Sequence, residues 1–140
     1  MTQRCEKTKP QTNALPKPYE PTPSERRLIE THRAKANAKP PAPRMKVVEK
    51  DGVVVLSPDH PEPSIARDCL LEALGSRDTD FLEGLLKQLG NVSSQGRSID
   101  EEGLNFMLAI VKGIEPRDQV EAMLAAQMAA VHNATMTFRA

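Results

Sequence analysis

Three side chains near the middle of the chain are of the types that form a nucleophilic catalytic triad. Ser57, Asp59 and His60 lie within the four residues "SPDH". A triad needs a base that reaches the nucleophile and a carboxylate that orients the base. Neighbouring side chains in a proline-rich turn seldom have that reach, so the pattern favours a turn over a hydrolase site.

Three consecutive carboxylates are of the type that performs general acid–base chemistry. Asp100, Glu101 and Glu102 fall in the first turn of a predicted helix. Negative charge is favourable there because it meets the positive end of the helix dipole. The sequence therefore predicts that these residues begin a helix.

The histidines, cysteines and glycines of the sequence do not have the spacing that metal-binding and phosphate-binding sites need. The histidines, His32, His60 and His132, are far apart, and the cysteines, Cys5 and Cys69, are not closely paired. The glycines of "LGNVSSQGRS" lack the Lys-Ser/Thr ending of a phosphate-binding loop. We therefore predict no catalytic residue, no metal ligand and no cofactor, in a protein that is not an enzyme.

Charge is divided unevenly along a chain whose formal net charge is zero. Residues 1–50 hold 12 Lys and Arg against 5 Asp and Glu, and residues 51–140 hold 7 against 14. This asymmetry indicates a basic arm on an acidic body. The sequence has no apolar signal segment, no disulfide framework and no run long enough to span a membrane, so we expect a cytoplasmic protein without a membrane partner.

Residues 1–44 form the predicted basic arm, which is rich in proline and expected to be disordered. A short helix is expected over residues 23–37, with Thr22 as cap, Pro23 at the first position and Glu25 completing a capping box. Its apolar content is low, so it should form partly or on binding. Six basic side chains are candidate phosphate contacts for nucleic acid: Arg26, Arg27, Arg33, Lys35, Lys39 and Arg44. A solvated, solubilising tail is the simpler explanation of the same charges.

Residues 45–63 carry the one strand signal, a β-hairpin followed by a proline-rich linker. Two valine-rich runs flank Asp51 and Gly52, the dipeptide that a type I′ turn prefers. A hairpin alone is marginally stable in water. It must therefore pack on helices, pair with another copy, or do both.

Residues 64–140 form the predicted helical domain. Helices are expected over residues 64–75, 80–90, 98–113 and 116–138, with caps at Ser64, Asp80 and Ser98. The third is apolar nearly all round, apart from a polar strip of Asn105, Ala109 and Lys112, and is predicted to be central and buried. The fold class is mostly α: a small bundle of about four helices with one β-hairpin and a disordered N-terminal arm.

The last predicted helix carries large apolar residues at steps of three and four. Alanines fill the positions between them, which lets another helix approach closely. The large residues are the candidate partner face: Val120, Met123, Leu124, Met128, Val131 and Phe138. Packing inside one subunit and contact with a partner both explain the pattern, and the length of the helix leaves room for both.

Several stretches resemble an uncharacterised family of alphaproteobacterial proteins that often accompany plasmid, prophage or other mobile-element genes. They are "RMKVVEKDGVVVLSPDHPEP", "LLEALG" with "FLEGLLKQL", and "QGRSIDEEGLNFMLAIVKGIEPRDQVEAMLAAQMAAVHNATMTF". The resemblance covers about residues 44–138 and implies no activity and no site residues. Relatives continue with further helical sequence, which implies that this chain is a shortened version.

Two functions are consistent with these features. The first is a non-enzymatic helical interaction or oligomerisation module, which binds itself or another protein through residues 116–138. The alternative is an accessory nucleic-acid-binding protein that acts through its basic arm.

Overall fold

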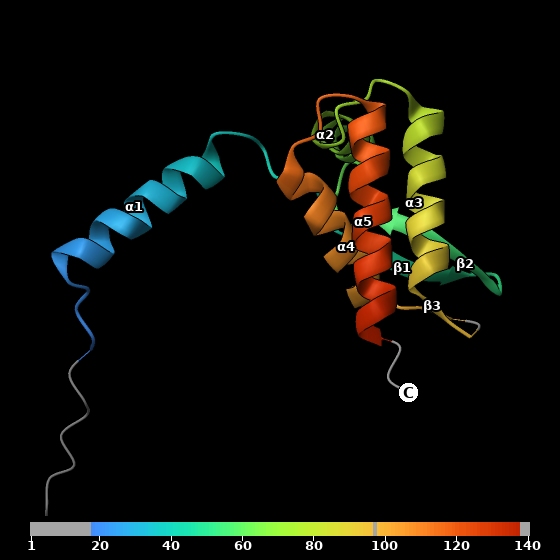
Figure 1. Cartoon of the computed structure of the whole chain (residues 1–140), viewed down its shortest axis with the longest axis horizontal. Helices are drawn as coiled ribbons and strands as arrows, with labels where there is room; N and C mark the ends of the chain where they lie inside the picture. Colours follow the sequence, from blue (N-terminus) through green and yellow to red (C-terminus); the bar gives the residue numbers. More distant parts are fainter. Residues whose placement is uncertain (1–17, 97, 138–140) are drawn as a thin grey trace, which may run out of the picture. The chain divides into compact units, whose positions relative to one another are not determined.

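The computed structural model describes residues 18–96 and 98–137 of a chain that divides into two compact units, Met1–Ala38 and Lys39–Ala140. The described residues form five helices and a two-stranded antiparallel hairpin, shown along the chain in Figure 1. The mostly helical class and the hairpin are confirmed, with five helices in place of about four. The predicted disorder of residues 1–17 concerns a segment outside the described residues.

The helix α1 (Pro23–Asn37) makes up most of the described part of the first unit. Its predicted capping box is confirmed, because the Thr22 amide donates to the Glu25 carboxylate at 2.7 Å and the Glu25 amide donates to Thr22 Oγ1 at 3.3 Å. The Tyr19 hydroxyl also donates to Glu25, and these hydrogen bonds lower the pKa of that carboxyl. All residues of α1 are described and none is buried.

In the second unit, β1 (Met45–Lys50) and β2 (Val53–Pro58) form the predicted hairpin. Asp51 and Gly52 have φ values of 52° and 75°, the two positive values of a type I′ turn. Met45, at the far end from the turn, is buried at 2% exposure. One end of the hairpin is therefore fixed in the core, and the valines near the turn lie in solvent.

The helix α2 (Pro63–Ala73) begins just before the predicted cap at Ser64, because the Glu62 side chain caps it instead. Its end at Gly75 is confirmed, and this residue has φ 60°. A Cβ atom at Gly75 would lie 2.2 Å from the carbonyl oxygen of Pro116. Both the dihedral angle and the close approach of a second loop therefore require glycine here.

The helix α3 (Thr79–Ser93) extends beyond both predicted ends. Asp78 caps it in place of Asp80, since its side chain accepts the third amide of the helix. Gly90 lies inside α3 and does not end it. A Cβ atom there would lie 3.1 Å from Leu56 Cδ1, so the glycine leaves room for the Leu56 side chain. The leucines predicted on one face are buried: Leu82, Leu85, Leu86 and Leu89.

Two very short strands, β3 (Ser94–Gln95) and β4 (Ser98–Ile99), follow α3 in a segment predicted as a loop. The helix α4 (Glu101–Ile114) comes next. Its cap is Asp100, which accepts the Glu102 amide at 3.1 Å, so the predicted cap at Ser98 is wrong. Ser98 lies in β4 instead.

The helix α4 contributes four apolar residues to the core, as many as α3, and each of them is 0% exposed. Its buried residues are Leu104, Asn105, Met107, Leu108 and Val111. Phe106 and Ile114 are each 49% exposed. The helix is therefore central, as predicted, but it is not covered all round.

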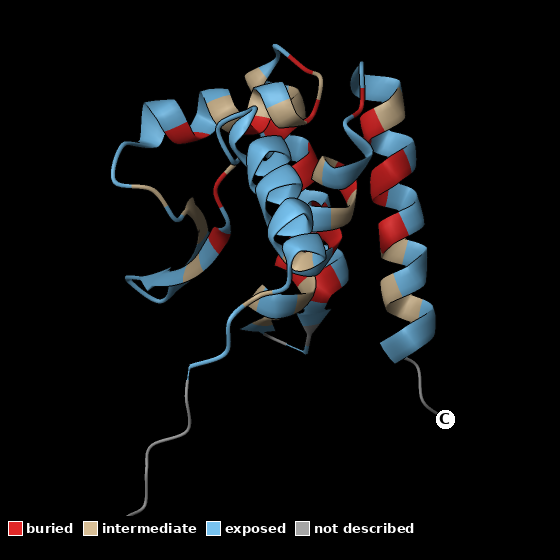
Figure 2. Cartoon of the chain, turned by 90° about the vertical axis from the view of Figure 1, so that its left-hand side faces the viewer, coloured by how far each residue is buried: buried red, intermediate tan, exposed pale blue. Residues whose placement is uncertain are grey.

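The helix α5 (Gln119–Thr137) packs against α3 and α4. It begins three residues after the predicted start at Pro116, because the Asp118 side chain accepts the Glu121 amide at 2.9 Å. Its buried residues are all alanines: Ala122, Ala125, Ala126 and Ala129. Figure 2 shows buried residues on one side of this helix and exposed residues on the other.

Candidate interaction surfaces

The face of α5 that points away from the core is apolar, and we call it the outer face. It is defined by Val120, Met123, Leu124, Met128 and Val131, which are 45% to 66% exposed. These are five of the six residues in the predicted partner face, and the sixth, Phe138, lies outside the described residues. Glu121 is the only Asp, Glu, Lys or Arg in the sequence of α5, so charge does little to keep this face in water.

The arrangement of α5 follows from side-chain size. Alanine at positions 122, 125, 126 and 129 lets the backbone of α5 approach α3 and α4 closely. Every large side chain of the helix is then left on the opposite side. A surface helix usually turns its large apolar residues inward, so this reversal makes the outer face a candidate contact surface.

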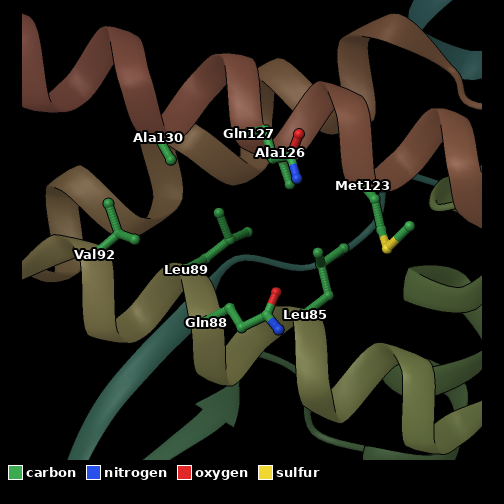
Figure 3. A pocket seen from close by; sticks show the side chains of 8 residues that line it. All are labelled: Leu85, Gln88, Leu89, Val92, Met123, Ala126, Gln127 and Ala130. Carbon is green, nitrogen blue, oxygen red and sulfur yellow. The ribbon is translucent and has the colours of Figure 1, made fainter.

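A shallow groove of about 150 Å³ runs between α3 and α5, beside the outer face. Figure 3 shows its lining side chains, which come from both helices. Leu85 and Leu89 line the groove from α3, and Met123 lines it from α5. The groove extends the apolar surface of α5 toward α3 and carries no charged side chain among its described lining residues.

A second arrangement joins α4 to the chain before and within β1, through polar side chains of α4. The Asn105 amide group accepts the Met45 N–H and donates to the Met45 carbonyl, both at 2.8 Å. Glu101 accepts the Val47 N–H at 2.9 Å. Lys112 donates to the carbonyl of Ala42 at 3.2 Å. The polar strip of α4 therefore forms hydrogen bonds with the backbone of Ala42 and Met45, a role that the spacing of these residues did not predict.

Lys112 is the one described side chain whose pKa is shifted downward by burial. Its ammonium group is partly buried against the Ala42 segment, and the nearby Arg44 guanidinium lowers the pKa further. An open groove beside it is lined by both acidic and basic side chains, including Asp68, Glu72 and Arg77. This mixture selects no charge class of ligand.

The two edges of the hairpin differ. The N–H and C=O groups of Met45 and the N–H of Val47 point away from β2 and are bound by α4. Because pairing alternates along an antiparallel ladder, Val54 and Leu56 direct their groups to the opposite edge. No hydrogen bond from another described element reaches them. The β1 edge is thus covered at Met45 and Val47, the end away from the turn, whereas the groups of Val54 and Leu56 on the β2 edge have no such cover among the described residues.

The candidate phosphate contacts fall into two groups. Arg26, Arg27, Arg33 and Lys35 lie on α1 and are exposed. In the second unit, Lys39 forms an ion pair with Glu115 at 3.1 Å, and Arg44 is exposed just before β1. The structure brings the first four together on one helix, and it gives Lys39 an acidic partner.

The candidate catalytic residues are engaged separately. Asp59 forms an ion pair with Lys46 at 2.8 Å, and His60 accepts the Glu62 N–H at its Nδ1 atom at 3.0 Å. Ser57 pairs in β2 with β1. Asp59 and His60 thus have local side-chain partners, and Ser57 is engaged through its backbone in the hairpin.

The acidic residues at the start of α4 have structural roles as well. Asp100 caps the helix, and Glu101 accepts a hydrogen bond from the Val47 N–H of β1. The His132 ring lies 5.9 Å from the ring of Phe106. Among the described residues, no three His, Cys, Asp or Glu side chains gather as metal ligands.

Within residues 18–96 and 98–137, no helix is long and apolar enough to cross a membrane. Comparisons with protein-family models, with curated proteins and with solved structures find no match to this chain. The resemblance to the alphaproteobacterial family stays a prediction. The surfaces of the molecule therefore carry the evidence for function, and the outer face of α5 gathers five exposed large apolar side chains on one helix.

Proposed function

We propose that the protein is a non-enzymatic interaction module that docks on other proteins or on itself through the outer face of α5. One observation carries the proposal: α5 buries only alanines and leaves its large apolar side chains in solvent. Burying an apolar side chain of this size contributes about 1.5–3 kcal/mol. Several such residues on one helix give a partner helix an apolar surface to bind.

The groove between α3 and α5 supports the same function. It lies next to Met123, so a partner on the outer face could also place a side chain between the two helices. Helix-in-groove recognition uses anchors at steps of three and four residues. The large residues of α5 have this spacing.

Charge insertion tests the proposal. We expect Leu124→Glu with Met128→Glu to abolish complex formation, measured by light scattering and by co-purification from extracts of the native host. Lys87→Glu is the control, because Lys87 is an exposed residue of α3 and its change also adds negative charge. A wild-type chain that forms no complex in either measurement, or a double variant that forms the same complex, would contradict the proposal.

A second candidate function is accessory binding of nucleic acid through α1. Four exposed basic side chains on this helix support it, against the two acids Glu25 and Glu30. Such contacts are electrostatic and independent of sequence. With four phosphate contacts, log affinity should fall with log salt at a slope of about −4.

The test of this alternative is a titration of labelled duplex DNA, followed by fluorescence anisotropy at several salt concentrations. Replacing Arg26, Arg27 and Arg33 by Gln should flatten the slope to about −1. The α5 double variant serves as the matched control and should leave the slope unchanged. Absence of binding at low salt would exclude this function.

A further inference from the structure

The exposed residues of α5 are arranged almost symmetrically about a point between Ala125 and Ala126. Val120 and Val131 lie equally far from this point, and so do Met123 and Met128. The buried alanines at positions 122 and 129 follow the same symmetry. The pairs whose members differ are Leu124 with Gln127, Glu121 with Ala130, and Gln119 with His132.

This symmetry matters because two copies of a helix that pack antiparallel are related by a two-fold axis across the helices. Such an interface uses the same patch on both copies and must be complementary to itself. With the axis at the point between Ala125 and Ala126, Val120 lies opposite Val131 of a second copy. Leu124 lies opposite Gln127 of that copy.

The spacing also fits a coiled-coil seam. Val120, Leu124, Gln127 and Val131 are separated by four, three and four residues, and this alternation keeps them on one stripe. Val131 and Leu124 then occupy one type of seam position, and Val120 and Gln127 the other. Antiparallel pairing places unlike seam positions opposite each other, as the two-fold axis requires. A polar residue in a seam favours one register over its alternatives.

Charge does not oppose this arrangement. Glu121 is the only charged residue in the sequence of α5, and it lies beside the stripe. In antiparallel register its neighbour on the second copy is Met128, so no two acids meet. Glu121 is also paired with Arg117 of its own chain, so its charge is largely compensated and the seam pattern carries the choice of orientation.

We propose that the partner of the outer face is a second copy of this chain, bound antiparallel with Val120 opposite Val131. The inference rests on the function proposed above and specifies its partner. The assembly is a closed dimer in which the two outer faces cover each other. The groove beside Met123 receives the flank of the second α5, which carries Ala130 and therefore fits closely.

Cysteine cross-linking tests both the partner and the register. In a chain with Cys5→Ser and Cys69→Ser, one sample carries Val120→Cys and the other carries Val131→Cys with a tag of different mass. Within one antiparallel register, residues 120 of the two copies are about 16 Å apart, as are residues 131. Disulfides need Cβ atoms about 4 Å apart. Mild oxidation should therefore link the mixed samples at least about tenfold more than either sample alone, because the dimer raises the effective concentration of the facing thiols.

Leu124→Glu in both chains should abolish the mixed product, and the Lys87→Glu control should keep it. Both cysteine sites are exposed, so circular dichroism should show an unchanged helical fold. Strong linking of Val120→Cys to itself would indicate a parallel pair and would overturn the inference. A wild-type chain that is monomeric at high micromolar concentration would overturn it too. If such a monomer still binds another protein, and Leu124→Glu with Met128→Glu abolishes that binding, the docking function stands and only the second copy is excluded.

Discussion

The helices α4 and α5 pack against each other and use their apolar residues in opposite ways. α4 turns Leu104, Met107 and Leu108 into the core, where each is 0% exposed. α5 turns alanines into the same core and leaves Leu124 and Met128 more than half exposed. Even polar residues follow this contrast, since Asn105 of α4 is buried and bound to backbone. An apolar helix sequence thus has two uses, and side-chain size on the inward face decides between them.

The largest expected difference concerns leucine truncation on the two helices. Leu108→Ala should lower the free energy of unfolding by about 3 kcal/mol, because it leaves a cavity in a fully buried site. Leu124→Ala should change it by less than about 0.5 kcal/mol, because that side chain is already in solvent. Urea denaturation at low protein concentration, where the chain is monomeric, measures both. Equal losses in the two variants would break the comparison.

Replacing the buried Asn105 of α4 should give the next largest loss of stability. Asn105→Leu leaves the N–H and C=O groups of Met45 without partners in a buried site, which costs about 2 kcal/mol. Hydrogen exchange of the Met45 amide should accelerate at the same time. Asn91→Leu is the control, since Asn91 is an exposed amide on α3 outside the groove and the loss of its side-chain amide should leave stability nearly unchanged. An Asn105→Leu variant as stable as the wild type would show that the polar strip of α4 does not hold β1.

Larger residues at the buried alanine positions of α5 should lower the stability of the fold. Ala125→Val adds volume where the backbones of α5 and its neighbours are close, and should cost about 1–2 kcal/mol. Gln127→Leu, on the outer side of the same helix, should leave the monomer unchanged and strengthen its self-association. Thermal unfolding and sedimentation equilibrium separate these effects. A fully tolerated Ala125→Val would mean that small size is not required on the inward face.

Lys112 should give the smallest effect, and its sign depends on pH. Burial lowers the pKa of Lys112 in the folded state. Between the folded and the unfolded pKa, the unfolded chain therefore binds more protons than the folded chain. Its contribution to stability therefore rises as pH increases through the folded pKa toward the unfolded value. Lys112→Met should remove this rise and change stability near neutral pH by less than about 1 kcal/mol, because the lost hydrogen bond to Ala42 is offset by the removal of a partly buried charge. An unchanged pH profile would contradict the assignment.

Local chemistry made some elements predictable from sequence. The capping box of α1, the turn at Asp51 and Gly52, and the end of α2 at Gly75 each depend on residues within a few positions of one another. The apolar spacing of α5 likewise identified the large side chains that form its outer face.

Interactions between distant segments were harder to predict. By spacing alone, Asn105 and Lys112 form only a polar strip, because their backbone partners lie about 60 and 70 positions away in the sequence. Gly90 resembled a helix end for the same reason, since only the packed hairpin shows that Leu56 needs the space. Which face of α5 turns inward also depends on neighbours, because both of its faces are apolar.

The cover that α4 places over β1 has a consequence for how the hairpin can polymerise. Sheets grow when exposed edges accept new strands, and a segment open on both sides can propagate without limit. Asn105 and Glu101 cover one edge of the hairpin at Met45 and Val47, so two copies that paired along their β2 edges could not extend the sheet past this end of β1. We therefore expect the Asn105 amide to limit strand addition to this valine-rich hairpin, in addition to its contribution to folding.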